Sequence, residues 1–315
     1  CSSDLIGVAL VQHAPRDPLP IGGGNRPIGL RLNLGRLNLP QQGRRGQQGN
    51  KQDSHCPIIL KMNAQEFYRA RNQRLTIDAL PSATGVDLDA AYAIAAEIAQ
   101  QHTAAGHRIA GRKVGFANRA MWRVLKLETV VWGHMYDDTV RFDLADFPLA
   151  GMHTPKIEPE IVIKVGNPQA GDGLAMAEWI ALGFEIVDTP FGEAKFTPID
   201  FVAAWGLHEG LIVGPPLAVT DANRDELSTQ LAEFKVALSK NGALVEEGAG
   251  KNSLKSPALC LTELAQAAAK RGDPLQPGEL ISTGSLTTAQ PVAPGEAWSA
   301  DLTGLPLPSL HLRFR

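Results

Sequence analysis

The segment Lys156–Val165 has the sequence KIEPEIVIKV, and we expect it to organise the fold. Its second half is β-branched and apolar apart from one lysine, which predicts a strand. Side chains two residues apart on a strand share a face, so Glu158 and Glu160 are expected to lie side by side. The later segment Gly183–Asp188, with the sequence GFEIVD, carries a third acid, Glu185, in another apolar run.

These three glutamates have two interpretations. Neighbouring carboxylates repel one another unless a proton or a cation lies between them, so Glu158, Glu160 and Glu185 would together suit a hard divalent cation such as Mg²⁺ or Mn²⁺. Zinc would be expected to bring His or Cys ligands. The alternative is a half-exposed edge strand whose acids face water, and the spacing alone leaves both interpretations open.

A lysine within an apolar segment is a further candidate for a functional residue. The segment Arg108–Phe116 is a short apolar run that contains glycines, and it predicts a strand with Lys113 close to its middle. Burial lowers the pKa of a lysine, and nearby opposite charges keep it ionised. In the alternative interpretation, the stem of Lys113 runs along the strand and the ammonium group reaches water.

Two adjacent acids, Asp137 and Asp138, follow an apolar run and are expected to lie in a turn. An Asp pair at a turn commonly serves the geometry of the turn itself. The pair becomes a functional candidate only if it faces the same cavity as the acidic strand.

The overall composition narrows the class of protein. The chain has 315 residues with 44% apolar content, which suffices for a buried core. Its formal net charge of −3 does not indicate a nucleic-acid partner. No segment approaches the roughly 18 unbroken apolar residues of a membrane span. Because Cys1, Cys56 and Cys260 are far apart, we expect no disulfide framework or zinc cage, and a reducing, cytoplasmic location.

Charge and composition change near Met62. Residues 1–61 contain eight basic and three acidic side chains, a net charge of +5, which leaves −8 for residues 62–315. The tract Gln41–Asn50 lacks helical or strand periodicity and predicts disorder. Since Met62 is the first methionine, we expect residues 1–61 to be a disordered leader outside the native protein, with a transit peptide as the alternative. Residues 62–315 are expected to form a single catalytic domain.

The remaining pattern predicts the fold class. Helices are expected mainly near the start of this domain and strands dominate behind, which favours an α+β fold on a mixed β-sheet roll with an N-terminal helical segment. Lys240–Gly242 predicts a hairpin turn. The sequence has no dinucleotide-binding, Walker or Gly-x-Ser-x-Gly motif. The expected helices are Asn63–Asp78, Asp87–His102, Asn118–Leu127, Leu174–Leu182 and Pro257–Lys270, with a helical turn or short helix at Phe201–Leu207.

Five short segments occur in a characteristic order: Gly111–Gly115, Gly133–Asp138, Ile157–Ile161, Phe184–Asp188 and Thr283–Thr287. Together they resemble the 2-keto-4-pentenoate hydratase and 2-oxo-3-hexenedioate decarboxylase family of the fumarylacetoacetate hydrolase superfamily. The resemblance spans nearly all of residues 62–315. It implies a fold like the C-terminal domain of fumarylacetoacetate hydrolase, a homo-oligomer and a small 2-oxo acid as substrate.

The resemblance also implies roles for individual residues. A Mg²⁺ or Mn²⁺ ion would be held by the three glutamates, Lys113 would line the same pocket, and Asp138 would handle a proton. The substrate carboxylate would be contacted by Ser285, Thr287 and the backbone around Gly284.

The activity that the resemblance implies is a metal-dependent hydro-lyase, which adds water to a 2-hydroxy-2,4-dienoate (2-oxo-4-enoate) to give a 4-hydroxy-2-oxo acid. The cation would stabilise negative charge on the keto oxygen of the substrate. The same chemistry would serve a 2-oxo-3-hexenedioate-type decarboxylase or an acylpyruvate C–C hydrolase. An interpretation of a different class is a catalytically silent partner subunit.

Two segments depart from the family pattern. Thr189 follows Asp188 where hydratases usually carry an arginine, and Ala203–His208 replaces an Asp-Asn-Ala stretch. Both segments are expected to shape the pocket, so they leave the exact substrate and reaction open. His208 is either a structural residue or a substitute for a missing polar group.

Overall fold

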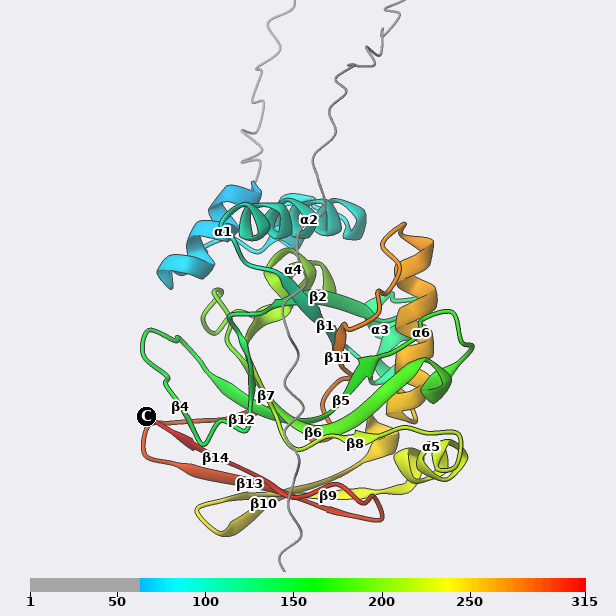
Figure 1. Ribbon diagram of the computed structural model, residues 1–315. Coiled ribbons are helices and arrows are strands. Elements are labelled where there is room, and N and C mark those ends of the chain that lie inside the picture. The colour runs from blue at the N-terminus through cyan, green and yellow to red at the C-terminus, as the bar shows by residue number, and fades with distance from the viewer. Residues whose placement is uncertain (1–62) are drawn as a thin grey trace, which may run out of the picture. The chain divides into compact units, whose positions relative to one another are not determined.

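The computed structural model of the protein describes residues 63–315. The predicted leader and the predicted start at Met62 therefore lie outside the described residues. Residues 63–315 form two β-sheets and six α-helices, which confirms the predicted α+β class (Figure 1). Within this part of the chain, no helix has the length and apolar character required to cross a bilayer.

The predicted N-terminal helical segment is present as α1 (Ala64–Gln73) and α2 (Leu88–Ala104). The helices begin at Asn63 and Asp87, whose side chains accept hydrogen bonds from backbone N–H groups three residues later. The other α-helices are α3 (Trp122–Leu125), α4 (Pro198–Ala203), α5 (Arg224–Glu233) and α6 (Pro257–Lys270), and short 3-10 helices span Pro81–Thr84, Arg119–Met121, Gly173–Met176, Trp205–Leu207 and Gly250–Asn252.

The larger sheet has nine strands in the order β2-β1-β11-β5-β6-β7-β3, with β12 paired to β5 and β8 to β6. It is mixed, because β1 and β11 are parallel, as are β3 and β7, while the other neighbours are antiparallel. Its strands are β1 (Ile109–Gly115), β2 (Val131–Tyr136), β3 (Val140–Phe142), β5 (Lys156–Val165), β6 (Ala177–Val187), β7 (His208–Val213), β8 (Leu217–Ala218), β11 (Leu280–Ser282) and β12 (Gln290–Pro291).

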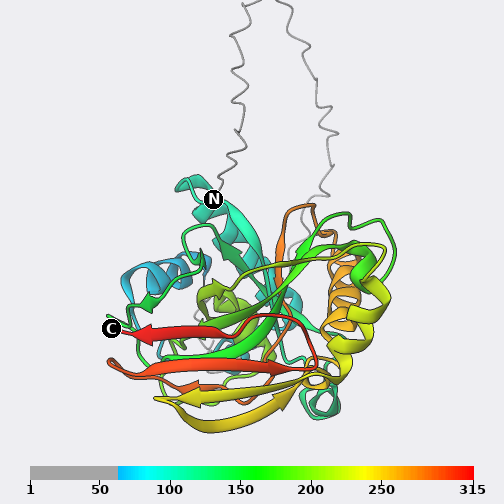
Figure 2. The ribbon, with the colours of Figure 1, turned by 60° about the horizontal axis from the view of Figure 1, so that its bottom comes forward.

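The smaller sheet has five strands in the order β10-β9-β13-β14-β4. Figure 2 shows its yellow, orange and red strands side by side at the front. The predicted hairpin joins β9 to β10, and Asn241 and Gly242 both have positive φ, as a type I′ turn requires. The strands are β4 (Asp146–Phe147), β9 (Lys235–Lys240), β10 (Ala243–Ala249), β13 (Ala297–Thr303) and β14 (Leu310–Phe314).

Two sequence predictions of helices are corrected by the structure. The expected helix Leu174–Leu182 is wrong, since β6 begins at Ala177 and its residue Trp179 pairs with β5 and with β8. Strand pairing on both sides outweighs the helical character of this apolar run. The expected helix Asn118–Leu127 is a 3-10 turn followed by the short α3, and α5 was not predicted.

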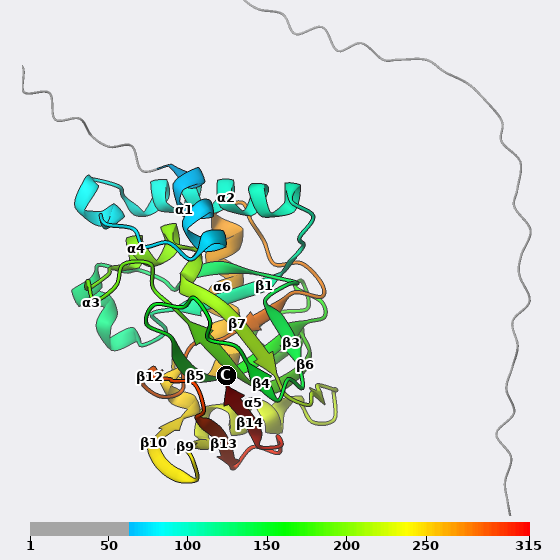
Figure 3. The same ribbon diagram turned by 90° about the vertical axis from the view of Figure 1, so that its left-hand side faces the viewer.

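The strand β5 separates two faces of the larger sheet. Ile161 and Ile163 belong to the main core, which also contains side chains of the smaller sheet, α5 and α6. Val162 belongs to a separate cluster on the opposite face. By alternation, Glu158 and Glu160 share the face of Val162. Figures 1 and 3 show α1 and α2 at one end of the domain and the smaller sheet at the other.

A buried aspartate at the start of α4 holds two loops together. Asp200 is 0% exposed and accepts hydrogen bonds from the backbone N and Oγ of Ser82, both at 2.8 Å, and from the N and Oγ1 of Thr197 at 2.7 and 2.8 Å. Its carboxylate thus satisfies four donors between α4 and the loop after α1.

Removal of the Asp200 carboxylate is expected to destabilise the protein. Asp200→Ala leaves four partly buried donors without this acceptor, so we expect the free energy of unfolding to fall by about 2–4 kcal/mol. Chemical denaturation measures this loss. Asp172→Ala, at an exposed aspartate, is the control and should change the value by less than about 0.5 kcal/mol. Equal values for the two variants would contradict the structural role of Asp200.

Candidate active site

The register of β5 and β6 brings the three predicted acids together. Glu158 lies directly opposite Glu185 across the two antiparallel strands, and Glu160 follows two residues later on the same face. One carboxylate oxygen from each glutamate lies within 4.8 Å of the other two. Three acids from two strands therefore converge on one point.

Glu160 is held by the segment that follows β11. Its Oε2 atom accepts hydrogen bonds from Ser282 Oγ at 2.5 Å and Gly284 N at 2.9 Å. Gly284 has a φ of 96°, and a Cβ atom there would lie 2.6 Å from the Cβ of Ala117, so the turn requires glycine. The other oxygen, Glu160 Oε1, is buried and has no hydrogen-bond partner among the described residues.

Glu185 is held in a similar way. Its Oε1 atom lies 2.8 Å from His208 Nδ1. Its Oε2 atom lies 3.0 Å from Lys113 Nζ but not in hydrogen-bonding geometry, so it too has no hydrogen-bond partner in the described part of the chain. Glu160 thus presents one oxygen without a partner among the described residues, and Glu185 presents one whose neighbour is the ammonium group of Lys113.

This donor set fits a hard divalent cation. Buried polar atoms are rarely left without a partner, and unsatisfied carboxylate oxygens from Glu160 and Glu185 beside Glu158 are the ligand atoms that Mg²⁺ or Mn²⁺ prefers. No thiol or imidazole belongs to this group of ligand atoms, which disfavours zinc.

Lys113 is buried rather than extended into water, with 4% of its surface exposed. Burial lowers the pKa of Lys113, but Glu185 first, and then Glu158 and Glu160, outweigh this effect and raise the pKa above the ordinary value. The ammonium group therefore remains charged. It also lies 5.0 Å from the centre of the Phe201 ring.

The acids differ in their proton affinity. Burial raises the pKa of Glu158 to about 7, and burial with the neighbouring carboxylates raises the pKa of Glu160 well above its ordinary value. Burial also acts on Glu185, but the charge of Lys113 and the contact with His208 lower its pKa overall. Because three negative charges repel one another at this point, a cation would displace protons as it binds.

A cavity of about 680 Å³ opens above these groups. Lys113, Glu158 and Glu160 line one part of it, and Asp188 holds a neighbouring loop by accepting hydrogen bonds from the N–H groups of His153, Thr154 and Thr189. The predicted carboxylate-contacting residues, Gly284, Ser285 and Thr287, also line the cavity.

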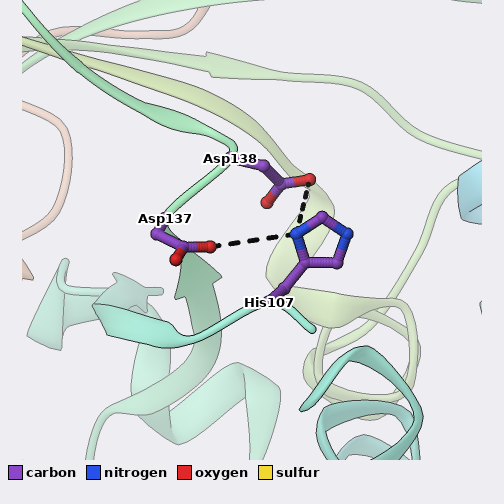
Figure 4. A group of neighbouring side chains, drawn as sticks. All are labelled: His107, Asp137 and Asp138. Carbon is purple, nitrogen blue, oxygen red and sulfur yellow. Dashed lines mark ion pairs between the residues drawn. The ribbon is translucent and has the colours of Figure 1, made fainter. Parts of the chain in front are cut away.

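Asp138 lies apart from these residues. It does not line the cavity, and its carboxylate is 3.7 Å from His107 Nδ1, which is also 3.8 Å from Asp137 (Figure 4). Asp137 itself accepts hydrogen bonds from the N and Nε of Arg108 and so stabilises the turn. Neither acid of this pair lines the cavity, so the proton-handling role of Asp138 stays a prediction that this geometry does not support.

We therefore expect Asp138→Asn to change kcat/KM by less than about 3-fold, because the side chain is 42% exposed and outside the cavity. Steady-state turnover of the metal-loaded protein measures this. A loss of two orders of magnitude would return Asp138 to the active site.

Thr139 is a functional candidate that sequence reasoning missed, and His208 is one for which it left both a structural and a functional role open. His208 is 0% exposed and connects Glu185 to Thr139, whose Oγ1 is 3.0 Å from His208 Nε2. Burial lowers the pKa of His208. In the sequence, His208 is distinguished by its position in the segment Ala203–His208, which departs from the family pattern.

Comparison with known proteins decides the family. No protein-family model matches the chain. A 2-keto-4-pentenoate hydratase of Paraburkholderia xenovorans (strain LB400) is 27% identical over 252 residues, 77% of this chain and 90% of the relative. A 4-oxalocrotonate decarboxylase of Pseudomonas sp. (strain CF600) is 31% identical over 222 residues, 68% of this chain and 81% of the relative. The chain belongs to the 2-keto-4-pentenoate hydratase and 4-oxalocrotonate decarboxylase family.

A solved member of this hydratase and decarboxylase family has the same fold. The 4-oxalocrotonate decarboxylase from Pseudomonas putida G7, complexed with magnesium and adipate, matches with a TM-score of 0.72 at 28% identity, over 80% of this chain and 95% of that protein. The family resemblance deduced from the five sequence segments is thereby confirmed.

Proposed function

We propose that the protein is a divalent-metal-dependent hydro-lyase that adds water to a 2-hydroxy-2,4-dienoate to give a 4-hydroxy-2-oxo acid. The observation that carries this proposal is the convergence of Glu158, Glu160 and Glu185 beside the buried Lys113, next to a cavity that Glu158, Glu160 and Lys113 line. The chain is also related over most of its length to a hydratase that acts on 2-keto-4-pentenoate.

The three glutamates would hold Mg²⁺ or Mn²⁺ through carboxylate oxygens. When bound, such a cation supplies Lewis-acid stabilisation of negative charge on the keto oxygen of the substrate. Glu160 and Glu185 are fixed on their protein-facing sides by Ser282, Gly284 and His208, so their free oxygens are already oriented.

The remaining groups bind and orient the substrate. Lys113 keeps a proton on Nζ because the nearby glutamates raise its pKa, so it acts as a hydrogen-bond donor or an acid rather than as a base. Ser285 and Thr287 line the cavity and would contact the substrate carboxylate. Their hydroxyls donate to the carbonyls of Thr287 and Thr288, so this contact requires the hydroxyl protons to turn toward the substrate. The N–H of Gly284 already donates to Glu160, so Gly284 contributes through the shape of the turn.

The test uses the full-length protein, stripped of metal by a chelator and then supplied with Mg²⁺ or Mn²⁺. Turnover of a 2-hydroxy-2,4-dienoate should depend on the added metal, consume the ultraviolet chromophore and give a product heavier than the substrate by one water. No turnover of any dienoate with either metal would contradict this function and favour the silent-partner interpretation.

One feature of the cavity favours a second candidate, a decarboxylase of the 2-oxo-3-hexenedioate type. Three of the five basic residues that line the cavity, Arg119, Lys251 and Lys255, lie on two neighbouring segments. The segments that carry them lie side by side, because the N–H of Leu254 donates to the carbonyl of Ala117 at 3.2 Å. These three positively charged side chains suit a substrate with a second carboxylate, whereas a pentadienoate has only one carboxylate.

Lys255→Met separates these candidates. We expect kcat/KM for 2-oxo-3-hexenedioate to fall about 5- to 10-fold and that for a monocarboxylic dienoate to change by less than about 2-fold, because a partly solvated charge pair contributes about 1 kcal/mol. Lys270→Met, at an exposed position outside the cavity, is the control. Equal effects on both substrates would argue against recognition of a second carboxylate by Arg119, Lys251 and Lys255.

A further inference from the structure

The two buried glutamates of the proposed cation site are held by different kinds of donor. Glu160 receives a hydroxyl and a backbone N–H, from Ser282 and Gly284. The Oε1 atom of Glu185 has a single hydrogen-bond partner, the ring nitrogen Nδ1 of His208, at 2.8 Å. The orientation of the Glu185 carboxylate therefore depends on this histidine and on the ion pair between its Oε2 atom and Lys113 Nζ at 3.0 Å.

An irregularity in strand pairing brings His208 to this position. Ile186 pairs with Gly210, but the next residue of β6, Val187, pairs with His208, so the register between β6 and β7 shifts by one residue. A bulge of this kind redirects a side chain relative to a regular strand. His208 consequently lies fully buried against Glu185.

The second nitrogen of His208 has a partner that can fix the position of the ring proton. Thr139 Oγ1 lies 3.0 Å from His208 Nε2 and accepts a hydrogen bond from Tyr136 N at 3.3 Å. The hydroxyl also lies 3.0 Å from Tyr136 O and can donate its proton either to that carbonyl or to Nε2. Donation to Nε2 is the choice that leaves the ring proton on Nδ1, facing Glu185.

We propose that His208, oriented by Thr139, is a positioning residue for the cation site. Thr139 donates to Nε2, the ring carries its proton on Nδ1, and Nδ1–H donates to Oε1 of Glu185. This arrangement would leave Oε2, which also lies 3.0 Å from Lys113 Nζ, available to a cation. The opposite tautomer would place a nitrogen lone pair against a carboxylate, which is repulsive. The inference rests on the proposed cation site.

The affinity of the full-length, metal-free protein for Mn²⁺, measured by calorimetry or by the resonance of free Mn²⁺, tests the role of His208. His208→Asn keeps an N–H close to the position of Nδ1 and should bind Mn²⁺ within about 3-fold of the wild type, whereas His208→Gln displaces the donor and should bind at least about 10-fold more weakly. His102→Asn, at another buried histidine outside the cavity, is the matched control.

The outcomes are distinct. A residue that only fills space would give the Asn and Gln variants the same Mn²⁺ affinity, and that result would overturn the inference. A wild-type protein that does not bind Mn²⁺ would overturn the cation site as well. Wild-type binding together with unimpaired binding by His208→Gln would reject only the role of His208.

A second pair of variants addresses Thr139 and serves if His208→Gln does not fold. Thr139→Val removes the donor to Nε2 with little change in volume and should weaken Mn²⁺ binding about 3- to 10-fold, while Thr139→Ser should restore it. Nitrogen-15 resonances of labelled histidine report the tautomer directly, and the His208→Asn variant assigns the signal. Wild-type affinity in Thr139→Val, or a wild-type ring protonated only on Nε2, would refute the arrangement.

Discussion

Glu160→Gln is expected to bind Mn²⁺ at least about 100-fold more weakly than the wild type and to lose metal-dependent turnover, yet to remain folded. The amide oxygen can still accept hydrogen bonds from Ser282 and Gly284, so the local packing is preserved. The substitution replaces the unsatisfied, negatively charged side of the carboxylate with an NH₂ group that repels a cation. Calorimetric titration and turnover measure the two losses.

The matched control is Glu178→Gln, which changes an exposed glutamate on the same strand as Glu185 that pairs with Lys164 at 3.0 Å. It removes the same charge from a solvated site and should leave Mn²⁺ affinity within about 2-fold of the wild type. A Glu160→Gln protein with full turnover would contradict the assignment of the cation site.

The period of two in KIEPEIVIKV explains why the acidic cluster could be predicted. Alternation alone places Glu158 and Glu160 on one face, and a second apolar run with a central acid supplies Glu185 from the neighbouring strand. The same logic places Lys113 in the sheet. Local periodicity thus predicts strands and faces, whereas the convergence of the three acids on one cation and the place of Lys113 beside them were implied by the family resemblance.

Contacts that depend on local irregularities could not be predicted in this way. His208 reaches Glu185 through a shift of register that no periodicity signals. Asp138 follows a strand closely, but its turn directs it toward His107 and away from the cavity. The direction of a turn depends on tertiary packing, so adjacent acids in a sequence do not specify which surface they face.

Lys113→Met is expected to lower the free energy of unfolding of the metal-free protein by about 3–5 kcal/mol, because it removes one partner of a buried ion pair. Methionine keeps most of the volume of the stem. The charge of Lys113 lowers the pKa of Glu185, so in the wild type this pair adds stability above the unfolded carboxyl pKa, and that stability is lost as the pH falls through the lower folded value. The deficit of the variant should therefore be larger at neutral pH than in acid.

The same variant should respond to metal. Mn²⁺ would supply positive charge to the glutamates that Lys113 compensates, so saturating Mn²⁺ should reduce the deficit in stability by at least about half. Turnover should remain low, because the proton donor at Nζ is lost and the cation does not replace it. Denaturation in chelator and in Mn²⁺, at neutral and at acidic pH, measures these effects. A deficit that is the same with and without Mn²⁺ would show that Lys113 acts only through packing and not through the charge of the acidic cluster.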